Sequence, residues 1–397
     1  MIPLALKYFS EWFHWTVPAV FFYTSTRIIL ASLFSLLIAL FFGPYCIKKL
    51  YELKIGQPIR DFTGFKFLLA ELHKNKKNTP TMGGVLMIIS FLIGALLWID
   101  LKHPFTWFLV LGTLIMGGLG ALDDLQKLKS NSFRGLSGKT RLLIQALFGV
   151  ALLSYFYFPA LSGFFESLGF IKPTIIDSLS QSKVTLSEYM ERLYIPFVKN
   201  PILATSLFGI LSLGFLDLIV ISGSCNGVNL TDGLDGLAAG CSIFVVGVLA
   251  IFGFASNNQE LAAYLNILYV EGAGEVSVFL AAVAGSALGF LWYNSHPAQV
   301  FMGDTGSLAL GGVIGISAVL LKREGLLGLV GGIFVAETVS VILQVISFQL
   351  TGKRIFRCAP LHHHYEYEGI HESKVVIRFW IFGLILALAG LASLKFQ

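Results

Sequence analysis

Residues 301–321 read FMGDTGSLALGGVIGISAVLL, a stretch that joins one carboxylate, Asp304, to an uncharged run ending at Leu321. A helix needs about 20 mostly apolar residues to cross the roughly 30 Å hydrocarbon core of a bilayer, so we interpret 306–321 as a membrane span. Glycine recurs within it, and small residues let membrane helices pack closely. The stretch predicts a helix inside a membrane bundle, with an acidic residue at one end.

The rest of the chain has the same character. Hydrophobic residues make up 55% of the 397 positions and charged residues 13%, whereas about a quarter of the residues in a soluble domain are charged. Because the apolar residues come in long runs, we predict an all-α polytopic membrane protein with ten transmembrane helices, in which residues 1–397 form a single integral membrane domain. The predicted spans are 24–47, 81–100, 105–122, 142–158, 202–222, 237–254, 276–294, 306–321, 326–350 and 376–395.

Lysine and arginine are unevenly divided between the two sets of loops that ten spans create. One set holds 18 of these residues, with the adjacent Arg378 included, and the other holds 10. Basic residues collect on the cytoplasmic side, so we expect the richer set inside and both termini outside. We interpret 159–201, the longest external loop, as a surface excursion without chemistry. The richer set consists of 48–80, 123–141, 223–236, 295–305 and 351–375.

The cysteine and charge content exclude some classes. The four cysteines have no metal-site spacing and none lies in an external segment, so we expect no structural disulfide. The net charge of +5 is small, and we expect the lipid bilayer, with no nucleic acid, as the macromolecular surroundings of the chain.

Acidic residues gather at one side of the predicted membrane. Asp123, Asp124, Asp232, Asp235 and Asp304 all fall at cytoplasmic ends of spans, where a carboxylate is costly and is a functional hypothesis by default. Two of them are consecutive, two are three residues apart and one is flanked by glycine, which favours a cation or phosphate site. Mg²⁺ prefers a few carboxylate oxygens together with substrate phosphates. Helix capping remains open as the alternative, above all for Asp304.

Basic residues and histidines in the same loops favour a phosphate ligand. Lysines precede the 78–84 segment, and Lys139 and Arg141 follow the aspartate pair, although such residues also serve as topology anchors. Three consecutive histidines stand at 362–364. Adjacent histidines on an extended loop diverge, so we favour hydrogen bonding to a diphosphate or a base over Zn²⁺ binding.

Five motifs of the sequence form a recognisable set. They are NTPTMGG at 78–84, DD at 123–124, GVNLTDGLDGLA at 227–238, PAQVFMGDTGSLALGG at 297–312 and GKRIFRCAPLHHHYE at 352–366. Together they resemble bacterial phospho-N-acetylmuramoyl-pentapeptide transferases of the polyprenyl-phosphate N-acetylhexosamine-1-phosphate transferase superfamily. The resemblance runs from about residue 24 to the C-terminus, and the ten-span topology agrees with it. The aspartate pair alone is weak evidence, whereas the 301–312 stretch and the histidine loop are specific to this branch.

The resemblance implies a reaction and its place. The family joins UDP-N-acetylmuramoyl-pentapeptide (UDP-MurNAc-pentapeptide) to undecaprenyl phosphate, giving lipid I and UMP, with Mg²⁺ as cofactor. It implies a bacterial inner membrane location, with the active site facing the cytoplasm and the termini in the periplasm. Whether the chain forms a homodimer stays open.

The resemblance also implies roles for particular residues. It makes Asp123, Asp124 and Asp304 the catalytic core. Mg²⁺ binds Asp304 with Asp124 close by, and Asp123 deprotonates or orients the lipid phosphate. Phe301 stacks on the uracil, and the histidine loop contacts the sugar-nucleotide. The implied substrate-binding residues are Lys76, Thr81, Lys139, Asn229, Asp232, Gly233, Leu234, Asp235, Asn294, Phe301, His362, His363 and His364.

Several alternatives remain open at this point. Asn131 stands where many members of the family have lysine, so it takes no charge-donating role. Direct attack by the lipid phosphate and a two-step route through a covalent aspartyl intermediate on Asp304 both fit these residues, and we favour direct attack. A relative that uses a UDP-N-acetylglucosamine-type donor and a secondary transporter are the two rival functions. Transporters usually hold their acidic residues near mid-membrane and often contain internal repeats, which this sequence does not show.

Overall fold

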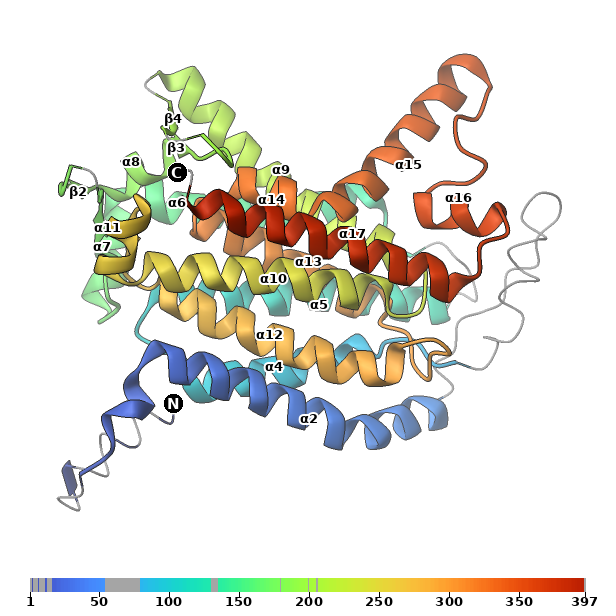
Figure 1. The fold of residues 1–397 in the computed structure, drawn as a ribbon, viewed down its shortest axis with the longest axis horizontal. Coiled ribbons are helices and arrows are strands. Elements are labelled where there is room, and N and C mark those ends of the chain that lie inside the picture. Colours follow the sequence, from blue (N-terminus) through green and yellow to red (C-terminus); the bar gives the residue numbers. More distant parts are fainter. Residues whose placement is uncertain are drawn as a thin grey trace.

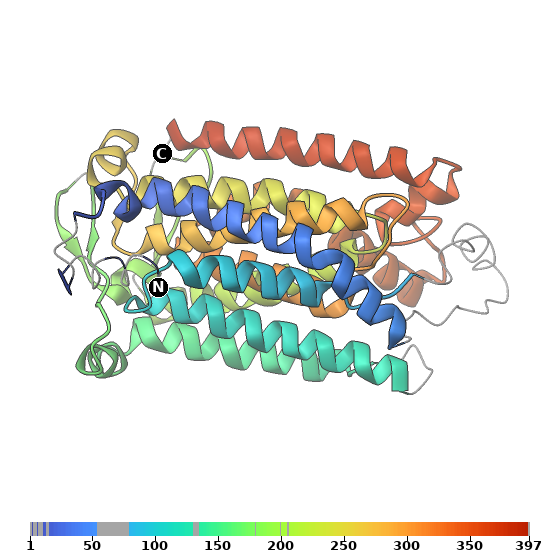
Figure 2. The ribbon, with the colours of Figure 1, turned by 90° about the horizontal axis from the view of Figure 1, so that it is seen from below.

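A computed structural model describes residues 2, 6, 11–12, 16–53, 79–129, 135–178, 180–198, 200–204 and 206–395. The helices in front in Figure 2 run roughly along one direction, and within these ranges nine helices are long and apolar enough to cross a membrane. They are α2 (Thr24–Glu52), α5 (Pro104–Lys129), α6 (Gly138–Tyr157), α9 (Leu207–Thr231), α10 (Leu237–Ser256), α12 (Ala273–Asn294), α13 (Gly303–Leu320), α15 (Gly332–Thr351) and α17 (Glu372–Ala392), which the 3-10 helix η3 (Ser393–Lys395) continues.

The all-α prediction is confirmed, and each predicted span overlaps a helix. The span predicted at 326–350 is not one helix, because it is divided at Gly331 between α14 (Glu324–Val330) and α15. The span predicted at 81–100 is the apolar helix α4 (Gly84–Trp98), which at 15 residues is shorter than the other nine. The helices α5 and α9 end seven and nine residues beyond the predicted spans 105–122 and 202–222. In both helices, polar residues interrupt the apolar run several residues before the helical hydrogen bonds end. The acidic motifs therefore lie on or next to the last turns of these helices.

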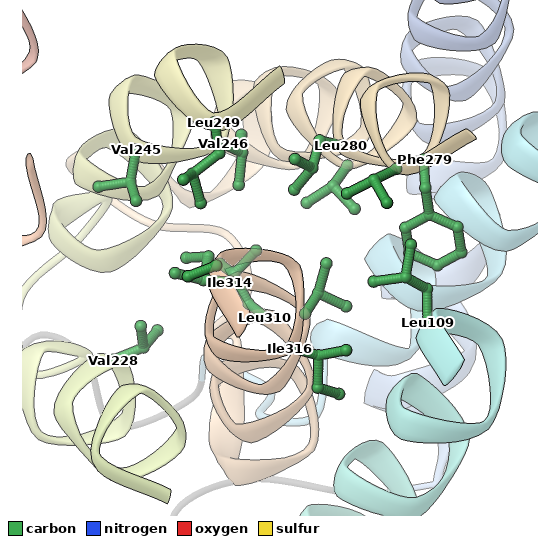
Figure 3. Packing of buried hydrophobic residues seen from close by; sticks show 14 of the residues in the cluster. Leu109, Val228, Val245, Val246, Leu249, Phe279, Leu280, Leu310, Ile314 and Ile316 are labelled. Carbon is green, nitrogen blue, oxygen red and sulfur yellow. The ribbon is translucent and has the colours of Figure 1, made fainter. Parts of the chain in front are cut away.

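The helix α13 lies at the centre of the bundle. Every residue from Thr305 to Leu320 is buried. Figure 3 shows Leu310, Ile314 and Ile316 of α13 surrounded by apolar side chains from α5, α9, α10 and α12. Glycines permit this packing, because a Cβ added at Gly311 would lie 2.3 Å from the Ser224 carbonyl oxygen of α9. The close helix packing predicted from the glycines is therefore present.

A second group of helices packs against this centre. The helix α2 crosses α12 closely enough that a Cβ added at Gly285 would lie 2.0 Å from the Ser32 carbonyl oxygen. At one end of this crossing Arg27 forms a bidentate ion pair with Glu275, with N–O distances of 2.7 and 3.0 Å. The Arg27 guanidinium also donates to the Trp98 carbonyl oxygen of α4, at 3.2 Å, so this ion pair ties three helices together.

Short strands and helices cover one end of the bundle, where α2 begins and α17 ends (Figure 1). The predicted 159–201 excursion forms most of this cover, and its strand β1 pairs antiparallel with both β2 and β5. Because β5 belongs to the connection between α10 and α12, two loops far apart in sequence share one sheet. The elements are α7 (Pro159–Ser167), β1 (Ile175–Ile176), β2 (Lys183–Val184), α8 (Leu186–Met190), β3 (Arg192–Leu193), β4 (Ile202–Leu203), α11 (Gln259–Leu265) and β5 (Tyr269–Val270).

The opposite end carries the sequence motifs. There the short helix α16 (Leu361–Tyr367) lies between α15 and α17, and α15 leans away from the bundle (Figure 1). Two further short helices complete the fold, η1 (Ala19–Phe22) before α2 and α14 (Glu324–Val330) after α13. The four cysteines all lie in the described part of the chain and are free, as predicted.

Candidate active site

The ends of three helices meet where the acidic motifs lie. Asp123 and Asp124 belong to the C-terminal part of α5, and Asp304 lies in the first turn of α13. The two helices approach closely because Gly120 has no side chain: a Cβ there would lie 2.1 Å from the Asp304 carbonyl oxygen. Carboxylates 180 residues apart in sequence are thereby brought into one cluster.

Asp124 caps the N-terminus of α13. Its carboxylate accepts hydrogen bonds from the backbone N–H groups of Asp304, at 3.2 Å, and Thr305, at 2.9 Å. The Thr305 hydroxyl donates to it as well, at 2.7 Å. The first N–H groups of a helix have no partner within the helix and carry partial positive charge. Capping, the alternative for Asp304, therefore falls to Asp124, and α13 has no side-chain cap of its own.

A lysine that sequence reasoning did not single out joins the other two carboxylates. Lys127 Nζ lies 2.6 Å from Asp123 Oδ2 and 2.8 Å from Asp304 Oδ2. Arg141 of α6 also donates to Asp304 Oδ2, at 3.4 Å. The signal was present in the sequence, because Asp123 and Lys127 are four residues apart and therefore neighbours on one helix face.

The end of α9 adds an amide and a further carboxyl group to the cluster. The Asn229 side-chain amide donates to Asp304 Oδ1 and to the Ser307 hydroxyl, both at 2.9 Å. Asp232 immediately follows α9 and accepts a hydrogen bond from the Gly303 backbone. Burial, reinforced by the nearby charges of Asp304 and Asp124, raises the pKa of Asp232 to about 8.

The segment before α4 runs alongside the segment before α13. The Phe301 N–H donates to the Pro80 carbonyl oxygen, at 2.8 Å, and the Gly83 N–H donates back to the Phe301 carbonyl oxygen, also at 2.8 Å. Gly303 has φ +74°, and a Cβ there would lie 2.9 Å from both Thr81 Oγ1 and Asp124 Oδ2. Thr81 and Phe301 are thus placed next to the acidic cluster, whereas Lys76 lies outside the described residues.

The turn between α9 and α10 is held by side chains from two other segments. Glu372, the first residue of α17, accepts a hydrogen bond from the Asp235 N–H at 2.8 Å. Asp235 Oδ2 in turn accepts from the Ala298 N–H and lies 3.1 Å from His296 Nδ1. The ligand atoms of Asp235, His296 and Glu372 lie within 4.8 Å of one another. Both carboxylates face the imidazole, so a protonated His296 would pair with them.

Asn294 closes the same turn from the end of α12. Its amide oxygen accepts from the Gly236 N–H, at 3.1 Å, and its amide nitrogen donates to the Val300 carbonyl oxygen, at 2.9 Å. In this turn Leu234 is buried and Gly233 is exposed. The 232–236 turn is therefore fixed by hydrogen bonds to α12, the 295–301 segment and α17, which suits a loop that must hold one shape for a ligand.

The three histidines lie on a helix rather than on the extended loop that we expected. They belong to α16, where successive residues turn by about 100°, so they still point apart. His362 is buried, His363 Nδ1 lies 2.7 Å from Glu366 Oε2, and His364 Nε2 lies 3.5 Å from Glu368 Oε1. Of the three, His362 reaches the 232–236 turn, because a Cβ at Gly233 would lie 2.2 Å from its Nε2.

Most of the residues named from the sequence thus lie at one end of the bundle. Lys139 is exposed in the first turn of α6, two residues before the Arg141 that reaches Asp304. The catalytic, binding and metal roles themselves stay predictions, since they describe chemistry with a bound substrate.

The cluster suits a hard divalent cation. Asp123, Asp124, Asp232 and Asp304 offer carboxylate oxygens, Asn229 adds an amide, and these are the ligand types that Mg²⁺ prefers. Lys127 and Arg141 are the two basic side chains that pair with these acids among the described residues. With Asp232 mostly protonated below its pKa of about 8, three carboxylates face two basic side chains, which leaves a net negative charge that a divalent ion would offset.

Comparison with known proteins settles the family. A family model described as glycosyl transferase family 4 matches residues 106–322. A protein of Protochlamydia amoebophila named phospho-N-acetylmuramoyl-pentapeptide-transferase is 51% identical, and the alignment covers 100% of both chains. The chain belongs to the phospho-N-acetylmuramoyl-pentapeptide transferase family. Members from Leptospira biflexa and Methylacidiphilum infernorum, with the same name, are 44% and 42% identical over 95% of this chain and 95% and 96% of their own.

Family membership extends over the whole site. The glycosyl transferase family 4 match contains the five acidic residues of the sequence motifs, whereas Thr81 and the histidine helix α16 lie outside it. The full-length alignment with the Protochlamydia relative covers these parts too. The resemblance drawn from the motifs is confirmed.

Proposed function

We propose that this protein transfers phospho-N-acetylmuramoyl-pentapeptide from UDP-MurNAc-pentapeptide to undecaprenyl phosphate, giving lipid I and UMP. The proposal rests on two observations. The chain belongs to this family, and the ends of α5 and α13 bring Asp123, Asp124 and Asp304 together. A soluble donor and a lipid acceptor must meet at the membrane surface, and charged groups at the ends of apolar helices suit that meeting.

The two ends of the donor have separate candidate sites. The 232–236 turn and Phe301 are the proposed site for the uracil, with the aromatic ring available for stacking. The acidic cluster with Lys127 and Arg141 is the proposed site for the diphosphate. Thr81 and Asn229, which lie against the acidic cluster, are proposed to orient the phosphates, and Lys76 and Lys139 to add positive charge.

Phosphoryl transfer depends on positioning and on charge neutralisation. An oxygen of the lipid phosphate attacks the sugar-bearing phosphorus, and the bond from that phosphorus to the bridging oxygen breaks, releasing UMP. Asp123 orients the lipid phosphate or accepts its proton, and Lys127 and Arg141 offset the charge that builds up on the phosphates. Asp304, with Asp124 close by, would hold Mg²⁺, and the bound ion would supply positive charge that stabilises the leaving UMP.

The contacts of Asp304 favour direct attack over a covalent aspartyl intermediate. Its Oδ1 accepts from Asn229, and its Oδ2 pairs with Lys127 and Arg141. A carboxylate engaged at both oxygens by donors is a poorer nucleophile than a free one. A search by mass spectrometry for Asp304 carrying phospho-MurNAc-pentapeptide, after donor is added without lipid, separates the two routes: direct attack predicts an unmodified residue.

We also propose that this end of the bundle faces the cytoplasm of a bacterial inner membrane. The loops at this end carry most of the lysine and arginine residues, which collect on the cytoplasmic side. Labelling of single cysteines introduced at Lys139 and at Lys183, on opposite ends of the bundle, tests the orientation. Only the residue-183 cysteine should react with an impermeant maleimide in intact cells, and the reverse pattern would contradict the proposal.

Product formation tests the reaction and its donor. Purified protein in detergent, with undecaprenyl phosphate, should release UMP and form lipid I from UDP-MurNAc-pentapeptide and should lose this activity when EDTA removes Mg²⁺. Turnover of UDP-N-acetylglucosamine in its place would point to the other branch of the superfamily. Solute transport by proteoliposomes without UMP release would support the transporter.

A further inference from the structure

Glu337 is an acidic residue that the proposed mechanism does not use. It lies inside the apolar helix α15, and its side chain is completely buried. An ionisable side chain in a membrane helix is costly and is kept when it has a partner or a function. The acids described above lie at or beside helix ends, so Glu337 is a separate feature.

The partner of Glu337 is His362. Glu337 Oε1 accepts a hydrogen bond from the His362 backbone N–H at 3.1 Å and lies 3.3 Å from His362 Nδ1. Both side chains are at most 1% exposed. Among the described residues, Glu337 Oε2 and both ring nitrogens of His362 have no hydrogen-bond partner, so the 3.3 Å approach of Nδ1 to Oε1 is a close polar contact rather than a hydrogen bond. The hydrogen bond from the His362 backbone N–H holds Oε1 beside the ring, and this contact limits how the buried imidazole can turn.

His362 presses on the turn that we assign to the nucleotide. Its Nε2 and Cε1 lie 2.2 and 3.0 Å from the position that a Cβ would occupy at Gly233. The hydrogen bonds of the turn described above are made by Asp235 and Gly236, to Glu372, Ala298 and Asn294. The imidazole thus contacts Gly233, a residue that these hydrogen bonds do not involve.

We propose that Glu337 is a positioning residue: its carboxylate holds the His362 imidazole against Gly233 and so fixes the 232–236 turn in the shape that receives the donor nucleotide. The inference rests on the proposed function, because it takes that turn as the donor site. The alternative is that Glu337 serves only as a helix cap, because the hydrogen bond that it accepts comes from the His362 N–H, one of the first N–H groups of α16.

The test compares three variants of the full-length enzyme in steady-state kinetics with both substrates. Glu337→Ala should raise the KM for UDP-MurNAc-pentapeptide by about tenfold to a hundredfold, the size of effect that a misplaced binding group produces, and leave the KM for undecaprenyl phosphate unchanged. Glu337→Gln keeps an oxygen for the backbone N–H and should lie between Glu337→Ala and wild type. Ser340→Ala, one turn along α15 and also buried, is the matched control and should behave as wild type.

Coupling to His362 provides the second readout. Because Glu337 acts through His362, the Glu337→Ala and His362→Ala double variant should be no worse than His362→Ala alone. A purely structural cap would instead lower the Tm or the active fraction with an unchanged donor KM, and that result would overturn the proposal. Additive effects in the double variant would overturn it as well.

Failure of the proposed function is distinguishable from failure of this inference. If the wild-type enzyme releases no UMP, the function is wrong, while calorimetric titration with UMP still tests the positioning role. Weaker UMP binding by Glu337→Ala, with wild-type affinity in Ser340→Ala, would support the inference. Equal UMP affinity in wild type and Glu337→Ala would overturn it.

Discussion

Replacing Lys127 with alanine removes an ammonium group that contacts two carboxylates of the cluster. Its Nζ lies 2.6 Å from Asp123 and 2.8 Å from Asp304. At an effective dielectric constant of 20, each such contact is worth about 6 kcal/mol before desolvation is subtracted. Breaking a buried ion pair costs about 3–5 kcal/mol net. We take about 3 kcal/mol, the lower end of that range, because the Lys127 side chain is 31% exposed.

That energy sets the size of the expected effect. Each 1.36 kcal/mol corresponds to a tenfold change in rate, so Lys127→Ala should lower kcat/KM about a hundredfold. The assay is release of UMP from UDP-MurNAc-pentapeptide in the presence of undecaprenyl phosphate. Lys129→Ala is the matched control, because Lys129 is exposed at the same end of α5. If Lys127→Ala keeps kcat/KM within twofold of Lys129→Ala, the assigned charge-neutralising role is wrong.

Three further predictions concern pH, stability and the histidine helix. The pKa of Asp232 is raised from its ordinary 3.8 to about 8, so the folded protein binds an additional proton between these values and its stability should fall as pH rises from about 4 to about 8. Asp232→Asn should flatten that dependence of Tm in Mg²⁺-free buffer. Arg27→Ala should lower the free energy of unfolding by about 3 kcal/mol, because the buried Glu275 would lose its counter-charge and keep only the hydrogen bond from the Asp100 N–H. Neither KM should change much, and a Tm equal to that of wild type would count against this prediction. His363→Ala should raise the donor KM or abolish activity without changing topology, and unchanged kinetics would make the histidine helix structural.

The spans could be predicted from the sequence because apolar runs and helix length share one physical cause. The helix ends could not, because α5 and α9 keep their backbone hydrogen bonds beyond the point where polar residues interrupt the apolar run. These extra turns matter, since Asp123 and Asp124 lie on one of them and Asp232 follows the other. The histidine motif shows the same limit: a polar stretch predicted as a loop forms the short helix α16.

The sequence showed most of the residues that form the site, but it did not show which of them contact one another. The sequence identified the carboxylates because each stands at the end of an apolar run. Lys127 was overlooked although its spacing from Asp123 was visible. Glu372 had no local signal, because its partner Asp235 lies 137 residues away. Glu337 had one, as the single acidic residue of the predicted span 326–350, but its partner His362 could not be predicted because only the fold brings the two together.

The central claim is that carboxylates from α5 and α13 act together on one donor diphosphate. The most direct measurement is UMP release by purified Asp304→Asn with both substrates and Mg²⁺, compared with wild type. The substitution keeps the side chain's size and removes its charge, so a folded, inserted protein with almost no UMP release is the predicted result. Turnover at the wild-type rate would contradict the assignment of Asp304 and, with it, the proposed reaction centre.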